Sequence, residues 1–436
     1  MDDRKKIVAW SLYDWANSAY STTVVGTILQ TYLVNITPNN QGPGLWSTTI
    51  TISATLAFVL APILGAIADA TNIKKKLWTL FMLLGSISTI LMFFVTSDLY
   101  WLGAVLAVVS SVAFSSSFVF YNAFLPEIAS EGQRDRVSSL GFALGYLGGG
   151  LLLLLNLVLI MGADKFGITT GLASRISLAS AGVWWLGFSI PMWRRIHDLP
   201  RDAAHPVAKG NPITSGFAQL ARTLVEMRKF PQAFLFLIAF ILYNDGIQSV
   251  IGLSSTFATA ELKLDLSTVI GVFLMVQFLA FGAAWVFGRI SERVGAKRAI
   301  MGGLVVWTFI VVMAYVWVRE GWQFWVLGAS VALVMGGTQA ISRSLFSRLI
   351  PRDKSAEFYG LYETSDKVSS IFGPLIFAIV FGATQSVRGG ILALIVFFIA
   401  GMLLLSRVRV SRGMKDVAAY EAASNAAAGI TAASQR

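Results

Sequence analysis

Two acidic residues lie inside long apolar stretches of this chain, where a charge is costly. Asp14 lies within residues 8–34 and Asp245 within residues 232–257, and each stretch can cross a bilayer at about 1.5 Å per helical residue. A carboxylate facing lipid would be strongly disfavoured, so both helices must turn a polar face towards protein or water. We expect these carboxylates to bind a proton or a solute ammonium group. The competing interpretation is a hydrogen bond that fixes helix packing.

Other polar side chains accompany the two aspartates. Neutral donors and acceptors that suit either a solute or hydrogen bonds between helices are Asn17, Tyr20, Tyr121, Asn122, Asn244, Gln248, Gln277 and Gln339. Arg343 lies near the end of residues 322–346, where its planar guanidinium suits a substrate carboxylate or a gate acid. Glu363, Asp366 and Lys367 have helical spacing, and we interpret them as a gating salt network at a helix end.

The elements that carry these residues are membrane-spanning helices. The chain of 436 residues is 56% hydrophobic and 13% charged, which is typical of a polytopic membrane protein. Hydropathy predicts twelve spans, at residues 8–34, 46–69, 77–97, 99–123, 137–161, 175–193, 232–257, 268–290, 299–318, 322–346, 358–384 and 388–407.

A basic, proline-containing break divides these spans into six and six. We therefore predict an all-α polytopic membrane protein with twelve transmembrane helices in two six-helix bundles, at 1–196 and 232–408. The linker at 197–231 has the periodicity of a surface helix. The tail at 409–436 is rich in alanine and serine, and we expect it to be disordered and cytoplasmic.

The formal charge of +11 follows the predicted topology. Most of the 34 lysine and arginine residues lie on one side of the spans, together with both termini. The other side holds Lys165, Arg175, Lys263, Arg319 and Arg388. This asymmetry indicates an integral plasma (inner) membrane protein with both termini cytoplasmic, and it excludes a nucleic-acid partner as the reason for the charge.

A short pattern occurs once in each half. Gly65 and Asp69 precede the lysine run at 74–76, and Gly288 and Glu292 lie in the corresponding places of the second half, before Lys297. We expect both copies to act in gating, with Asp69 able to cap a neighbouring helix N-terminus or to pair with an arginine. Duplicated halves around a site at the membrane midplane are a transporter architecture.

Glycines recur every four residues within span five, at Gly141, Gly145 and Gly149. This spacing gives the span a smooth face on which another helix can cross closely. We interpret the face as a packing surface.

Two resemblances narrow the fold and function. Residues 64–76 resemble the Gly-x-x-x-Asp-x-x-Gly-Arg-Arg/Lys signature of the major facilitator superfamily, with Asn72 in place of the second glycine and Ile73 at the first basic position. The stretches at 13–20, 120–127, 138–149 and 243–246 together resemble the autophagy-related vacuole-effluxer family. The resemblance implies spans 1, 4, 7 and 10 around a cavity, alternating access and, from fungal relatives that export amino acids, an amino-acid-like substrate.

We therefore expect a secondary active transporter of a small polar solute, amino acid or peptide-like, with protons as candidate coupling ions. The alternative is a non-transporting receptor or scaffold on the same fold. An enzyme is disfavoured because the chain has no phosphate loop, nucleophile elbow or metal-ligand spacing. The expected partners are a small-molecule substrate, the lipid bilayer and protons. We expect no cofactor, and we expect a monomer.

Overall fold

The computed structural model describes residues 2–198 and 225–434, which are almost entirely helical. The first half contains α1 (Arg4–Ala19), the π-helix η1 (Tyr20–Ile28), α2 (Leu29–Ile36), α3 (Gly42–Thr71), α4 (Lys74–Leu91), α5 (Tyr100–Ala123), α6 (Leu125–Ile128), α7 (Arg134–Met161) and α8 (Thr170–Arg195). The second half contains α10 (Pro231–Thr256), the π-helix η6 (Phe257–Glu261), α11 (Leu266–Val294), α12 (Ala296–Val316), α13 (Gly321–Ser347), α14 (Ser355–Val368), α15 (Phe372–Thr384), α16 (Val387–Ala393), α17 (Ile395–Arg407) and α18 (Val410–Ser434).

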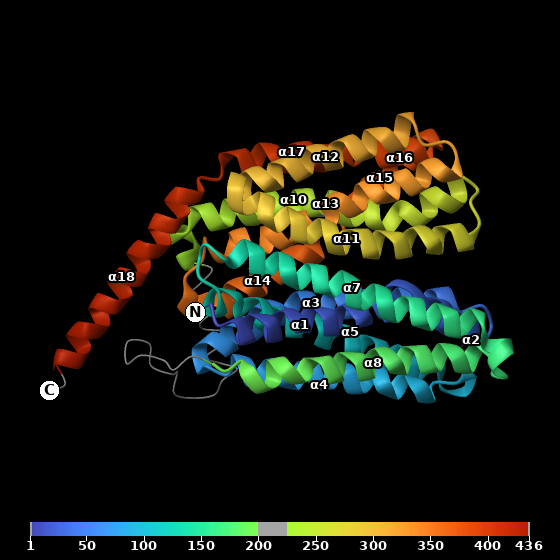
Figure 1. Ribbon diagram of the computed structural model, residues 1–436, viewed down its shortest axis with the longest axis horizontal. Helices are drawn as coiled ribbons and strands as arrows, with labels where there is room; N and C mark the ends of the chain where they lie inside the picture. The colour runs from blue at the N-terminus through green and yellow to red at the C-terminus, as the bar shows by residue number, and fades with distance from the viewer. Residues whose placement is uncertain (1, 199–224, 435–436) are drawn as a thin grey trace.

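The long helices lie side by side in two layers. Figure 1 shows α1, α3, α4, α5, α7 and α8 in one layer and α10 to α13 with α15 to α17 in the other. The layers meet where α7 packs on α11 and α13, and where α14 packs on α3 and α5. A site between the halves is therefore bounded by helices from both.

Eleven helical segments of the described residues are long and apolar enough to cross a membrane. A twelfth segment runs unbroken from residue 4 to 36 through α1, η1 and α2, and is less apolar because it carries Asp14, Asn17 and several hydroxyl side chains. The all-α fold with twelve spans is confirmed.

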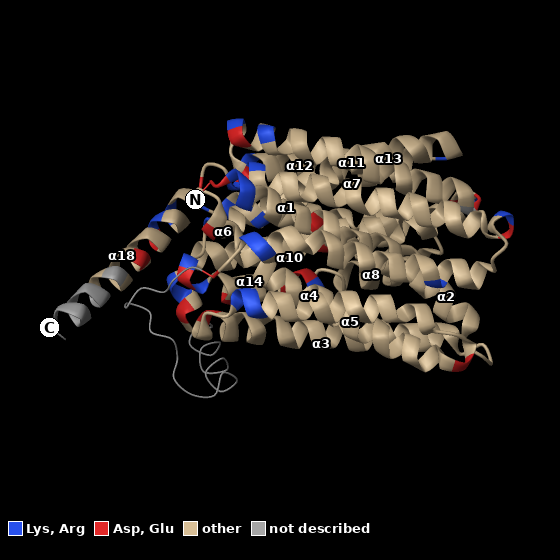
Figure 2. Ribbon diagram, turned by 60° about the horizontal axis from the view of Figure 1, so that its bottom comes forward, with Lys and Arg blue, Asp and Glu red and all other residues tan. Residues whose placement is uncertain are grey.

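Charge separates the two ends of the molecule. Figure 2 shows lysine, arginine and acidic residues gathered at the end where both termini lie, and few at the opposite end. We call the first of these the charged end. Its charges lie beyond or just inside the apolar helices, as expected for groups that stay in water.

The span predicted at 358–384 is two helices rather than one. α14 ends at Val368, and α15 begins at Phe372 after a short turn. Pro374 explains the break, because a proline inside a helix lacks an N–H group and clashes with the carbonyl four residues earlier. Proline is tolerated in the first turn of a new helix, where N–H groups have no partner within the helix.

The prediction of a disordered tail at 409–436 is wrong for its described part, which forms α18. Alanine has the highest helix propensity, and the tail is rich in it. The first turns also pack on the second half, with the Tyr420 and Phe230 ring centroids 5.3 Å apart. The predicted linker helix lies mostly within residues 199–224, outside the described residues.

The glycine face of α7 packs closely on α1, as predicted. A Cβ atom on Gly141 would overlap the Asp14 carboxylate, and one on Gly148 would lie 2.7 Å from the Trp15 carbonyl oxygen. The absence of side chains here brings α1 against α7 and places Asp14 at the interface between the halves.

Candidate functional site

A polar cavity of about 320 Å³ lies between the two halves. Its polar lining from the first half is Asp14, Asn17, Ser18, Ser21, Thr22, Ser115, Asn122 and Tyr146. Its polar lining from the second half is Asn244, Gln248, Gln277, Gln339, Arg343, Tyr362, Glu363, Asp366 and Lys367. The volume is at the lower end of the range for ligand sites, so the cavity suits a small solute.

A buried ion pair joins the halves at the cavity. Arg343 of α13 lies with its Nη2 3.2 Å from Oδ2 of Asp14, and their side chains are only 2% and 6% exposed. The Tyr121 hydroxyl donates a hydrogen bond of 2.7 Å to the same carboxylate oxygen. Because both side chains are almost fully buried, loss of either charge would leave the other without its charge partner.

The remaining Arg343 donors are also directed at the first half. Nε donates to Ser138 Oγ at 2.8 Å, Nη2 to the Ser138 carbonyl oxygen at 2.9 Å, and Nη1 to Asn122 Oδ1 at 3.3 Å. The guanidinium also stacks near Trp10, 4.7 Å from the ring centroid. We call Asp14, Asn122, Ser138 and Arg343 the latch. Two partners were considered for Arg343, a substrate carboxylate and an acidic residue of a gate. In this structure Arg343 pairs with an acidic residue, Asp14.

The first copy of the repeated pattern joins the halves at the charged end. Asp69 Oδ2 accepts a hydrogen bond of 2.8 Å from the backbone N–H of Glu357, in the first turn of α14. A Cβ atom on Gly65 would overlap the carbonyl oxygen of Ala356, so glycine permits the contact of α3 with α14. Lys74 pairs with Glu127 and donates to Ser355 Oγ. Asp69 thus caps a neighbouring helix, one of the two roles considered for it.

The second copy makes a different contact. A Cβ atom on Gly288 would lie 2.7 Å from Ser139 Oγ, so α11 crosses α7 closely there. Glu292 is exposed, and the acid at this crossing is Asp135 of α7. Asp135 accepts a hydrogen bond from Ser291 and pairs with Arg348 at 2.8 Å. With the first copy and the latch, this contact joins the two halves directly.

Three charged residues of α14 line the cavity beside the latch. Asn122 Nδ2 donates to Glu363 Oε1 at 2.8 Å, and Asn244 Nδ2 donates to Asp366 Oδ1 at 2.9 Å. Lys367 Nζ lies 3.7 Å from Asp366 Oδ2. The predicted network of Glu363, Asp366 and Lys367 therefore faces the cavity, because α14 begins at Ser355 and carries these residues well into the bundle.

Asp245 has a different position from Asp14. Its Oδ1 accepts from the backbone N–H of Gly373 at 2.7 Å and its Oδ2 from that of Phe372 at 3.0 Å. Ser249 Oγ also donates to it at 3.2 Å. Asp245 thus caps the free N-terminus of α15, where the partial positive charge of a helix favours a carboxylate.

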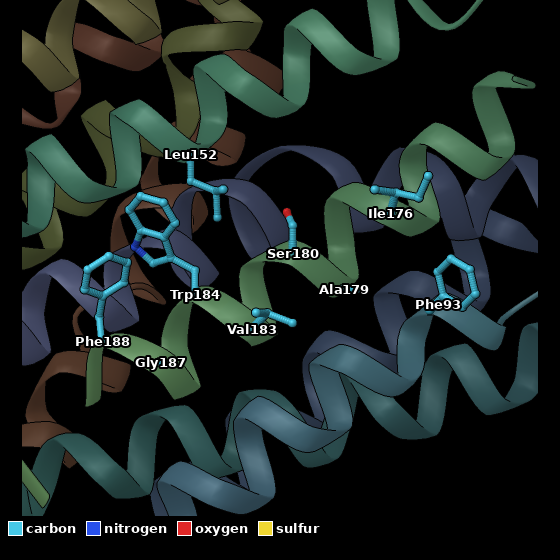
Figure 3. A pocket seen from close by; sticks show the side chains of 9 residues that line it. All are labelled: Phe93, Leu152, Ile176, Ala179, Ser180, Val183, Trp184, Gly187 and Phe188. Atoms are coloured by element: carbon cyan, nitrogen blue, oxygen red, sulfur yellow. The ribbon is translucent and has the colours of Figure 1, made fainter. Parts of the chain in front are cut away.

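A larger hollow, of about 760 Å³, lies along α8 and is apolar. Figure 3 shows its lining, including Leu152, Val183 and Phe188, with Ser180 among them. The Ser180 hydroxyl already donates to Asn156 Oδ1 at 3.1 Å. A polar solute would lose its hydrogen bonds to water in this hollow without replacement, so we assign the solute site to the smaller cavity.

Comparison with known proteins identifies the family. The family described as "Vacuole effluxer Atg22 like" matches residues 44–418. The chain is 31% identical to the MFS-type transporter YxiO of Bacillus subtilis over 407 residues, which cover 92% of this chain and 94% of that protein. The chain belongs to the Atg22-like vacuole effluxer family. This effluxer-family chain is also 27% identical to Autophagy-related protein 22 of Coccidioides immitis, over 88% of this chain and 75% of that protein.

Solved structures of the major facilitator superfamily share its fold. The human organic anion transporter MFSD10 superposes with a TM-score of 0.72 at 13% identity, over 93% of this chain and all of that one. The proton:xylose symporter XylE superposes with a TM-score of 0.71 at 12% identity, over 95% and 98%. These structures show the fold. The family match and the 31% identity to an MFS-type transporter make the effluxer-family chain an integral membrane transporter of this superfamily.

The cavity gathers most of the predicted site residues of this effluxer-family chain. Asp14, Asn17, Asn122, Asn244, Gln248, Gln277, Gln339 and Arg343 line it. Tyr20, Tyr121 and Asp245 are not among its lining residues. The Tyr20 hydroxyl instead makes a hydrogen bond of 2.9 Å with Ser110, and Tyr121 stacks on Trp10 at 4.3 Å between centroids. Asp245 points to α15 because it lies one residue, about 100° around the helix, from Asn244.

Two groups of residues that lie at the cavity or at the contacts between the halves were not predicted from the sequence. Ser18, Ser21 and Thr22 line the cavity where the first span widens into η1. Hydroxyl residues following Asp14 and Asn17 at helical spacing were the signal available for them, and π-helical turns are frequent at functional sites. Asp135, which joins the halves, had no such signal, because it follows a loop and its partner Arg348 is remote in sequence.

Proposed function

We propose that this effluxer-family chain carries a small polar solute, amino acid or peptide-like, across the plasma membrane by alternating access, with protons as candidate coupling ions. The observation that carries the proposal is the cavity between the halves, whose lining offers carboxylates, cations and neutral amides together. Amino acids present the complementary groups, and few converging polar groups suffice to orient a small ligand.

Alternating access requires the closed end to open. The hydrogen bonds of Arg343 to Asn122 and Ser138, and its ion pair with Asp14, join the halves directly. Rocking of the two halves would separate these partners and expose the same cavity to the charged end. Carboxylates at such a place are candidate proton carriers in transporters, and Asp14 and Glu363 hold that position here.

For localisation, we propose the plasma membrane with the charged end in the cytoplasm. The excess of lysine and arginine at the end that holds both termini supports this orientation. Similarity to the Bacillus subtilis transporter along nearly the whole chain supports a cell membrane, although the family description refers to a vacuole.

Solute counterflow in proteoliposomes tests the proposed function. Vesicles loaded with a mixture of unlabelled amino acids should accumulate labelled amino acid only when they contain the protein. Asn17→Ala should reduce the initial rate about five- to tenfold, the value of a lost hydrogen bond to a bound polar group. Asn156→Ala is the matched control, since Asn156 is equally buried but bonds to α8 outside the cavity, and it should keep the wild-type rate within about twofold.

If none of the amino acids and short peptides tested gave counterflow, the result would contradict the proposal and favour a receptor or scaffold. If Asn17→Ala and Asn156→Ala reduced the counterflow rate equally, the result would show that the solute does not bind in this cavity.

A further inference from the structure

The charges around the cavity do not balance. Three carboxylates line it, those of Asp14, Glu363 and Asp366, against the two cations Arg343 and Lys367. Asp14 and Arg343 neutralise one another in the latch. What remains on α14 is two carboxylates and one ammonium. When both carboxylates are ionised the cavity therefore has one uncompensated negative charge, which either a proton on Glu363 or a cationic solute neutralises.

The partners of these carboxylates are mostly neutral. Glu363, 7% exposed, accepts from the amide of Asn122, and Asp366 accepts from the amide of Asn244. Lys367 reaches only the edge of ion-pair distance to Asp366, at 3.7 Å. An amide donates a hydrogen bond but supplies no charge, so the cavity would gain from an occupant with a positive charge.

A second observation in the same cavity points to an occupant. Asn17 is 0% exposed and its amide interacts with the neighbouring Asp14 carboxylate, yet neither its side-chain oxygen nor its nitrogen makes a hydrogen bond of normal geometry within the described residues. A buried amide without a well-formed hydrogen bond is costly, and such groups call for a bound molecule or water. Asn17 offers one acceptor and two donors to whatever fills the space.

We propose that Glu363 and Asp366 form a binding subsite for an ammonium group, and that the solute bound in this cavity carries one net positive charge. This assignment rests on the proposed function, because it takes the occupant to be a transported solute. A dibasic amino acid such as lysine is the simplest occupant. Its two ammonium groups and one carboxylate are equal in number and opposite in charge to the two carboxylates and one ammonium group of α14. Asn17 supplies the neutral contact.

The same subsite reaches the latch. Asn122 donates through Nδ2 to Glu363 and accepts through Oδ1 from Arg343. A solute ammonium bound to Glu363 would share the carboxylate with Asn122 Nδ2. Occupancy of the cavity is thereby coupled, through Asn122, to a contact between the halves that also holds Arg343.

The first test uses the purified, full-length protein without solute. If Asp366 is a binding group, Asp366→Asn removes uncompensated charge, and the melting temperature should stay the same or rise by about 2 °C. If Asp366 is instead a structural ion-pair partner of Lys367, the melting temperature should fall by several degrees. Glu261→Gln is the matched control for a structural pair, since Glu261 pairs with Arg388 at 2.6 Å, and it should lower the melting temperature.

The second test compares L-lysine with L-norleucine, which has the same chain length but ends in a methyl group. Lysine should bind at least about tenfold more tightly, as measured by the melting shift of the protein over a concentration series, and Asp366→Asn should remove the difference. Equal responses to the two solutes, including no response to either, would overturn the subsite. Counterflow of norleucine at the same rate as lysine would overturn it while leaving the proposed transport function intact.

Discussion

Arg343→Gln is expected to lower the free energy of unfolding by about 3–5 kcal/mol, because the variant leaves the Asp14 carboxylate buried without its charge partner. Asp14→Asn should have a similar effect, since it leaves the guanidinium of Arg343 unpaired. The double variant Asp14→Asn/Arg343→Gln should lose less than the sum of the two, because neither buried charge then remains. Thermal or denaturant unfolding in detergent measures all three.

The control is an ion pair at the surface. Lys229 pairs with Glu226 at 3.5 Å, and its side chain is 61% exposed. Lys229→Gln should change the stability by less than about 1 kcal/mol, as expected of solvated pairs. Strict additivity of the two latch variants would show that Asp14 and Arg343 are not coupled, in contradiction to the latch.

The second large effect is expected at the break between α14 and α15. A Cβ atom on Gly373 would overlap the Ser249 hydroxyl and lie 2.7 Å from Asp245 Oδ1. Gly373→Ala must therefore displace the carboxylate that caps α15. We expect overpacking to lower the free energy of unfolding by about 1–3 kcal/mol, and the weakened cap to lower it further. The melting temperature of the purified variant gives the size of the effect.

Gly382→Ala is the matched control, because Gly382 lies in the same helix with open space around it. Alanine is favoured over glycine in a helix by about 1 kcal/mol, so this variant should be as stable as the wild type or more stable. If Gly373→Ala were equally harmless, the Asp245 cap would not hold the broken helix together.

The fold was largely predictable from the sequence. Long apolar stretches, the basic asymmetry and the glycine spacing at Gly141 and Gly145 each depend on local composition, and the corresponding helices and the close α1–α7 packing are present. The cap that Asp69 provides was also foreseen as one of two roles, because the position of a residue at a helix end restricts what it can contact.

The side-chain partners across the cavity were not predictable. Asp14 and Arg343 are separated by 329 positions, and no spacing in a single sequence indicates that they meet. Asp245 and Asn244 are neighbours in sequence, yet their side chains contact different partners, because successive residues of a helix are turned by about 100°. The tail shows the same limit: alanine-rich composition is compatible with disorder, and packing on Phe230 accompanies the helix observed.

Accessibility of the cavity from the charged end is the most direct test of the latch between the halves. The natural chain has no cysteine, so Gln248→Cys introduces a single thiol into the cavity wall. With an impermeant thiol reagent on the side of the charged end, we predict slow labelling of Gln248→Cys alone and a rate at least about tenfold higher when Arg343→Gln is added, because loss of the latch shifts the population towards the open state. The same rate in both proteins, in vesicles of known orientation, would contradict a cavity closed by Asp14 and Arg343.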